Sequence, residues 1–255
     1  MSKIAAIALN TFRESVRDRV LYNLVLFVLL LVIASIVMGR IAVGQEAKIV
    51  VDVGLSAMTV FGMLISILLG IGLVSKEIEK RTLANILSKP IRRGSFILGK
   101  YFGLCLTLAV QCAVMAAAIT LALLYAGDVS PGRLWPAAFL IFLELAIITG
   151  VALLFSTFSS PALSALFTLL IFLIGRWSPD LKLLADTSDS AITRATSRSL
   201  YHLLPNLANF NFINETAHGH TVPARLIAGN TVYAFCYIAA LIAASVLIFE
   251  RRNFK

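Results

Sequence analysis

Six long apolar runs set the limits on what this chain can fold into. An α-helix needs about 20 mainly apolar residues to cross the hydrocarbon core of a membrane, and these runs meet or approach that length. With 59% hydrophobic and 14% charged residues, the chain is more apolar than a soluble domain, which is about half apolar and about a quarter charged. The sequence therefore predicts an all-α integral membrane protein, one transmembrane domain over residues 1–255. The predicted spans are 20–38, 54–74, 101–126, 135–157, 161–177 and 229–249.

A short turn separates the fourth run from the fifth. Ser160 can cap a helix that Pro161 then begins. One helix through both runs would be too long for a single crossing of the bilayer, so the turn predicts two spans.

Residues 1–19 are predicted to form an amphipathic helix that lies at the membrane interface. At helical spacing the polar and the apolar side chains fall on opposite faces. The alternative is the charged start of a signal peptide, but the apolar run that follows exceeds the ~7–15 residues of such a peptide and lacks a small-residue cleavage site. The polar face holds Asn10, Arg13, Glu14, Arg17 and Asp18, and the apolar face holds Ala5, Ala8, Leu9, Phe12 and Val16.

The basic residues predict the orientation in the membrane. Of the 22 Lys and Arg, four precede the first run, seven lie in the loop between the second and third runs, and three lie in the tail. Cytoplasmic loops carry an excess of Lys and Arg, so both termini and residues 75–100 are predicted to be cytoplasmic. The turn between the fourth and fifth runs has no basic residue, and only parity places it on that side.

The net charge of +9 does not indicate a nucleic-acid-binding protein. Such a protein gathers its charge on a soluble face the size of a groove, whereas these basic residues lie between apolar runs. They are typical of topology signals and of attraction to anionic headgroups of the lipid bilayer. No nucleic-acid partner is expected.

The longest stretch without a span is residues 178–228, which the orientation places outside. It combines Ser, Thr and Asn with clusters of apolar residues, which is more apolar than a solvated linker. We expect short helices there that dip into the outer leaflet or cover the outer mouth of a dimer.

The basic stretch at 94–100 matches part of a nucleotide-binding loop, G-x-x-x-x-G-K. The next residue is Tyr101 instead of the Ser or Thr that reaches magnesium, no strand precedes the stretch, and a membrane span follows it. We therefore expect no nucleotide site in this chain.

The same cytoplasmic loop, 75–100, also suits a mechanical role. Residues 76–88 are predicted to form a helix of about 20 Å that could dock in a cleft of a soluble partner. Pro90 would end it. The residues alone leave open a second interpretation, a loop that only sets topology. The helix would carry Glu77 and Glu79 near its positive N-terminal end and an apolar stripe of Leu83, Ile86 and Leu87.

A resemblance decides between these interpretations. The loop is similar to the coupling segment of the ATP-binding cassette (ABC) type-2 permease family, whose pattern is E-x-x-T-L…L…P…R…G-K. The layout of interfacial helix, six spans, long outer region and basic tail is also similar. The matching residues are Glu79-Lys80-Arg81-Thr82-Leu83, Leu87, Pro90, Arg93 and Gly99-Lys100.

The resemblance implies a non-catalytic permease subunit of an ABC exporter in a bacterial cytoplasmic (inner) membrane. It implies a homodimer, or a dimer with a closely related permease, that binds two copies of a separate ATPase. ATP and Mg would then be bound by the ATPase, and this chain would hold no cofactor. The implied ATPase-coupling residues are Glu77, Glu79, Thr82, Leu83, Ile86, Leu87, Pro90 and Arg93.

Glu144 lies near the middle of the fourth span. An ionised carboxylate is costly there, so it must face the protein interior or water, or be protonated. It could line a substrate path or relay protons. It could equally be a protonated side chain bonded to a hydroxyl or backbone group of a neighbouring helix.

Other classes of function fit less well. An ion-coupled carrier needs several buried ionisable groups, and Glu144 is the main candidate. An intramembrane enzyme needs metal ligands or a nucleophile and base at membrane depth, and all three His lie outside the spans. The pair His218 and His220 is a weak metal motif, and no metal site is expected. A membrane scaffold for a soluble partner stays open.

Overall fold

The computed structural model describes residues 3–17, 45–79, 93–127, 131–188 and 190–251, together with positions 22, 26, 29–34, 36, 37 and 39. Every regular element in this part of the chain is a helix. The predicted first span, 20–38, lies mostly outside the described residues, as do residues 80–92 of the predicted coupling loop.

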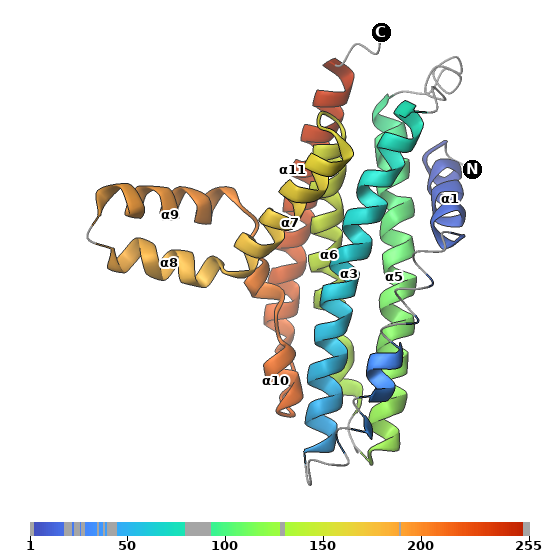
Figure 1. Cartoon of the computed structure of the whole chain (residues 1–255), viewed down its shortest axis with the longest axis vertical. Helices are drawn as coiled ribbons and strands as arrows, with labels where there is room; N and C mark the ends of the chain where they lie inside the picture. The colour runs from blue at the N-terminus through green and yellow to red at the C-terminus, as the bar shows by residue number, and fades with distance from the viewer. Residues whose placement is uncertain are drawn as a thin grey trace.

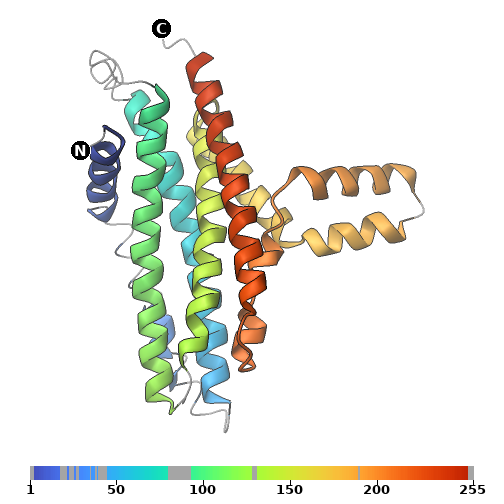
Figure 2. The same ribbon diagram turned by 180° about the vertical axis from the view of Figure 1, so that it is seen from behind.

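Four long helices run side by side and form the bundle (Figures 1 and 2). They are α3 (Glu46–Glu79), α5 (Arg93–Tyr125), α6 (Leu134–Ser156) and α11 (Ala224–Arg251). Each contains an apolar stretch long enough to cross a membrane. The predictions of an all-α fold and of several membrane-crossing helices are thus confirmed.

Helix α6 forms the centre of the bundle. It packs against α3, α5, α7 and α11 and is the most buried of the long helices. Its sequence is apolar all round, which is typical of a helix surrounded by others. A Cβ added at Gly70 of α3 would lie 2.6 Å from the Ala152 Cβ of α6, and one added at Gly62 would overlap Leu145. These glycines therefore serve packing within the chain.

The predicted fifth span, 161–177, is shorter than a full crossing. Ser160 takes the extended backbone of a cap and Pro161 begins the helix as predicted, although the Ser160 side chain makes no capping hydrogen bond. Helix α7 (Pro161–Arg176) has 16 residues, or about 24 Å, and the following α8 (Ser178–Thr187) turns away from it by 63°. Pro179 in the first turn of α8 favours this new helix start.

Residues 178–228 contain short helices, and their predicted position on the outer side stays a prediction. Helices α8 and α9 (Ala191–Leu203) form a hairpin that extends sideways from the bundle (Figures 1 and 2). The chain then returns through η2 (Leu207–Phe210) and α10 (Ile213–Ala217), which pack against α6 and α3. Two side chains of η2 are completely buried in the main core, so this stretch is far from a solvated loop.

Helix α1 (Lys3–Val16) lies lengthwise along the first half of α5 (Figure 1). Four residues of its predicted polar face, Asn10, Arg13, Glu14 and Arg17, are exposed, and Asp18 lies outside the described residues. The most buried side chains of α1 are the small Thr11 and Ser15 instead of the large apolar residues. The reason is close approach: a Cβ at Gly99 would lie 2.7 Å from the Ile7 Cβ, and one at Gly103 would lie 2.6 Å from the Thr11 Cβ.

Candidate functional site

The predicted coupling loop is described only at its two ends. The backbone remains helical from Glu46 through Glu79, so residues 76–79 continue α3 instead of starting a new helix at Lys76. No Gly or Pro interrupts residues 73–79. Glu77 and Glu79 therefore lie at the C-terminal end of α3, where the helix dipole does not favour acidic side chains, and not at a positive helix start.

Of the other predicted coupling residues, one lies in the described part of the chain and five do not. Arg93 is the first residue of this helix. The remaining five lie outside the described residues, and their role in coupling stays a prediction. They are Thr82, Leu83, Ile86, Leu87 and Pro90.

The first turns of α5, where the loop ends, are held on several sides. The Phe96 ring stacks on Phe249 of α11 with ring centres 6.3 Å apart, and the Lys100 ammonium lies 5.5 Å from the Phe96 ring centre. The Tyr101 hydroxyl donates a 3.0 Å hydrogen bond to the Ala146 carbonyl of α6. With α1 packed over Gly99, this end of α5 contacts three helices, so a displacement of the loop would be passed to all of them.

An ion pair occupies the middle of the bundle. Glu144 lies next to the midpoint of the 23-residue α6 and is fully buried. One terminal nitrogen of Arg176, the last residue of α7, donates to both carboxylate oxygens, at 2.7 and 3.0 Å. Of the alternatives given for Glu144, the structure shows the protein interior, and the partner is a guanidinium instead of a hydroxyl or backbone group.

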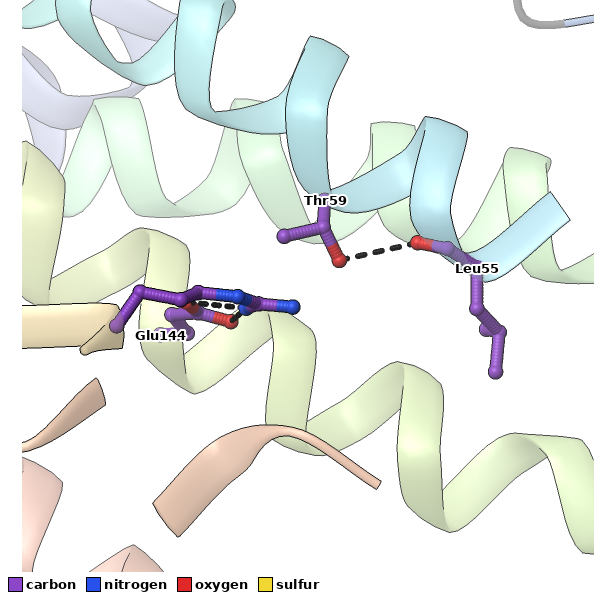
Figure 3. A network of polar contacts seen from close by, with 4 residues as sticks. Leu55, Thr59 and Glu144 are labelled. Carbon is purple, nitrogen blue, oxygen red and sulfur yellow. Dashed lines mark hydrogen bonds and ion pairs between the residues drawn. The ribbon is translucent and has the colours of Figure 1, made fainter. Parts of the chain in front are cut away.

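The surroundings of this pair are mainly apolar. The Arg176 side chain is 21% exposed, and its guanidinium carbon lies 6.0 Å from the Phe172 ring centre. Figure 3 shows Thr59 of α3 on the side that faces the pair, with its hydroxyl bonded to the Leu55 carbonyl at 3.0 Å. Because few polar groups compete for either charge, the pair fixes the end of α7 against α6.

Polar contacts also fix the junction between α7 and α8. The Ser178 hydroxyl donates to the Asn206 side-chain oxygen at 2.5 Å, and the Asn206 N–H donates to the Tyr233 hydroxyl of α11 at 2.9 Å. Gly175 allows the chain to pass close by, because a Cβ there would lie 2.6 Å from the Pro205 carbonyl oxygen. Segments far apart in sequence therefore meet beside the ion pair.

An apolar groove of about 820 Å³ is lined by residues of α5, α6 and α11 at the surface of the bundle. Tyr101 and Cys105 of α5 line one wall, and Phe235 and Ala239 of α11 line the other. Such a lining suits an acyl chain or the apolar face of another helix. No cluster of three or more metal-ligating side chains occurs among the described residues, and the His218 ring nitrogen Nδ1 lies 2.8 Å from the Asn214 carbonyl.

The sequence was compared with families of known proteins. The family described as "ABC-2 family transporter protein" matches residues 5–254, which is nearly the whole chain. The chain belongs to the ABC-2 transporter family. A search among curated proteins found no match.

Members of the ABC-2 family are membrane subunits, generally non-catalytic, of transporters that work with an ABC ATPase. The resemblance inferred from the 79–100 motif is thus confirmed over the full length. Membership disfavours the carrier and intramembrane-enzyme alternatives. The match includes both the loop that joins α3 to α5 and the α8–α9 hairpin.

Sequence reasoning missed Arg176, Asn206 and Tyr233. With 161–177 taken as a complete span, Arg176 falls at a membrane surface, where a basic residue needs no explanation. The available signal was that one apolar run contains an acid and another contains a base, since intramembrane charges commonly pair with one another.

Proposed function

We propose that this ABC-2 family protein is the permease subunit of an ABC exporter and that a separate ATPase drives it through the loop between α3 and α5. The observation that carries the proposal is the full-length family match, because it includes this loop. The packing of the first turns of α5 against α1, α6 and α11 supports a mechanical role for the loop.

The proposed layout has six crossings. The four long helices supply four, and residues 20–38 supply the first of the chain. The remaining crossing is broken: α7 reaches the middle of the bundle, and η2 and α10 continue to the end where α6 begins (Figure 1). The distribution of Lys and Arg supports cytoplasmic termini. The family resemblance supports a bacterial inner membrane.

The proposed assembly is a homodimer, or a pair of closely related permeases, with two ATPase copies that carry the ATP and Mg. The ATPase must hold residues 80–92 differently in its two nucleotide states, because a loop held equally in both would transmit no work. Movement of the loop would then displace α3 and α5 together, since it joins the end of one to the start of the other.

Affinity purification in mild detergent tests the proposal. The tagged chain is expressed with ABC ATPases of its own genome, and we expect one to co-purify at a one-to-one ratio. Its ATP hydrolysis should rise when the two subunits are reconstituted in lipid. A chain that retains no ATPase, or an ATPase whose rate is independent of this chain, would contradict the proposal.

A further inference from the structure

The α8–α9 hairpin leaves the bundle at its middle. The hairpin begins at Ser178, two residues after Arg176. The Arg176 side chain is bonded to Glu144, which lies next to the midpoint of α6. At the other end of the hairpin the Leu203 carbonyl accepts a 3.1 Å hydrogen bond from Tyr237, which lies at the centre of α11. Helix α6 is about 35 Å long, just enough to cross a bilayer, so its midpoint lies near the middle of the hydrocarbon core.

The hairpin lies across the long axis of the bundle (Figures 1 and 2), so its whole length remains near this depth. It packs only on itself along most of that length, with Ala185 and Ser197 buried in the seam. Beyond this seam, no other described helix packs along most of the hairpin, so its outward surface is free to contact a partner.

The charges of the hairpin exclude a purely lipid covering. Five charged side chains are exposed, and none forms an ion pair within the described residues. Ionised groups at the middle of a bilayer are costly and normally face protein or enclosed water. They are Asp180, Lys182 and Asp186 on α8 and Arg194 and Arg198 on α9.

The charges are divided between the two helices. Helix α8 has two acids and one base, whereas α9 has two arginines and no acid. Arg194, Arg198 and His202 follow one another at intervals of four, so they form a stripe along one side of α9. Ile192 and Leu203, which are 80% and 73% exposed, lie away from that stripe.

We propose that the α8–α9 hairpin is a contact surface for a second copy of this chain, with α8 of each copy lying against α9 of the other. This inference rests on the proposed function in that it uses the dimer. A two-fold axis places the same patch of both copies face to face. An acid of each α8 then lies opposite the arginine stripe of the partner's α9, so the two copies pair opposite charges that have no ion-pair partner among the described residues of one copy.

A second copy fits better than a soluble partner for two reasons. It occupies the same membrane at the same depth, whereas a soluble protein would have to enter the hydrocarbon core. Two hairpins also form a four-helix unit, in which each short helix gains a second packing surface. The aliphatic side with Ile192 and Leu203 remains for contact with lipid chains.

Cross-linking between two differently tagged copies tests the surface. In a chain with Cys105, Cys112 and Cys236 replaced by Ala, one copy carries Asp186→Cys and the other Arg198→Cys. The copies are co-expressed and treated in the membrane with a short bis-maleimide. We expect a covalent product of two chains that both tags retain, since each copy has one thiol and only contact between copies can link them.

In the matched control, the first copy carries Leu68→Cys instead of Asp186→Cys. Leu68 lies on α3, and its side chain is also exposed, at 52%. The yield of Leu68→Cys with Arg198→Cys should be at least tenfold lower. A second measurement uses light scattering in detergent: Arg194→Glu with Arg198→Glu should convert dimers to monomers, and adding Asp180→Arg with Asp186→Arg should restore the dimer mass.

Equal yields with Asp186→Cys and Leu68→Cys, cross-links to another protein, or wild-type dimerisation of the charge-reversed chain would overturn the inference. ATPase co-purification is measured on the same samples. A bound ATPase without linked hairpins would reject the hairpin surface alone, and linked hairpins without a bound ATPase would reject the proposed function alone.

Discussion

Arg176 reaches Glu144 because α7 ends at half the depth of the bundle. The two charges have few other partners, and both lie on helices that meet near this point. An ion pair in such a place adds little stability compared with apolar residues, but removing one partner leaves an uncompensated buried charge. At the scale of the residue, the pair therefore acts as a lock on the position of α7.

Single and double substitutions at this pair should differ. Glu144→Ala is expected to lower the free energy of unfolding by about 3–5 kcal/mol, because it leaves the Arg176 charge unpaired. The double variant Glu144→Gln with Arg176→Gln should recover most of that loss, since neither side chain is then charged. The measurement is the fraction of protein that stays monodisperse in gel filtration after heating in detergent.

A functional role of the Glu144–Arg176 ion pair is tested by measuring transport. If transport by a reconstituted Glu144→Gln variant equals that of the wild type while the protein is less stable, the pair is structural alone. A loss of transport at unchanged stability would instead place Glu144 on the substrate path.

At the scale of the element, the proposed coupling depends on the loop between α3 and α5 and on the α1–α5 contact. Residues 80–92 of the loop lie outside the described residues. Its two neighbours are long helices, and α5 lies against α1 over Gly99 and Gly103. In the proposed mechanism, a displacement of the loop would therefore reach both long helices.

The apolar stripe of the coupling segment should be needed for ATPase stimulation. Leu83→Asp is expected to reduce stimulation by the chain at least tenfold, because a carboxylate in an apolar contact loses its hydration without gaining a partner. Insertion into the membrane should not change. Leu83→Met is the control of similar volume, and full stimulation by a Leu83→Asp, Leu87→Asp double variant would reject the assigned role.

Enlarging Gly103 should separate α1 from α5. A Cβ at this position would lie 2.6 Å from the Thr11 Cβ, so Gly103→Leu is expected to destabilise the protein by about 1–3 kcal/mol and to expose α1 to protease. Gly132→Leu is the control, because no atom lies within 4 Å of a Cβ added there. Equal melting of the two variants would show that the contact adds no stability.

At the scale of the whole molecule, the proposed layout combines four complete crossings, one broken crossing and a first crossing at 20–38. Residues 161–217 cover the depth of a single span in pieces, with the hairpin inserted between them (Figure 1). With six crossings, the proposed layout keeps the two termini on one side even though α7 alone does not traverse the bilayer.

Thiol labelling of intact cells tests this topology. In the Cys-free chain, Gly132→Cys should react with a membrane-impermeant maleimide added outside, because it lies in the turn before α6. Lys255→Cys should react only after the membrane is permeabilised. Labelling of Lys255→Cys in intact cells would mean that the number of crossings is odd or that the orientation is inverted.

The sequence by itself determined the class of the protein, its family and four apolar runs that fall in long helices. Long apolar runs can only be satisfied in a membrane, and helix formation within such a run depends on residues close together in the chain. The helix start at Pro161 after the extended Ser160 and the exposure of Asn10, Arg13, Glu14 and Arg17 follow from the same local reasoning. The start of α6 near 135 was predicted within one residue because a polar turn precedes it.

Only the tertiary structure decided that α7 ends halfway along the bundle. Nothing in the apolar run 161–177 distinguishes a complete span from a half span, because the difference lies in what Arg176 meets. Glu144 is 32 residues earlier and Asn206 is 28 residues after Ser178. Such contacts form only when helices pack against one another. The ion pair, the buried η2 and the sideways α8–α9 hairpin therefore depend on residues that are distant in sequence.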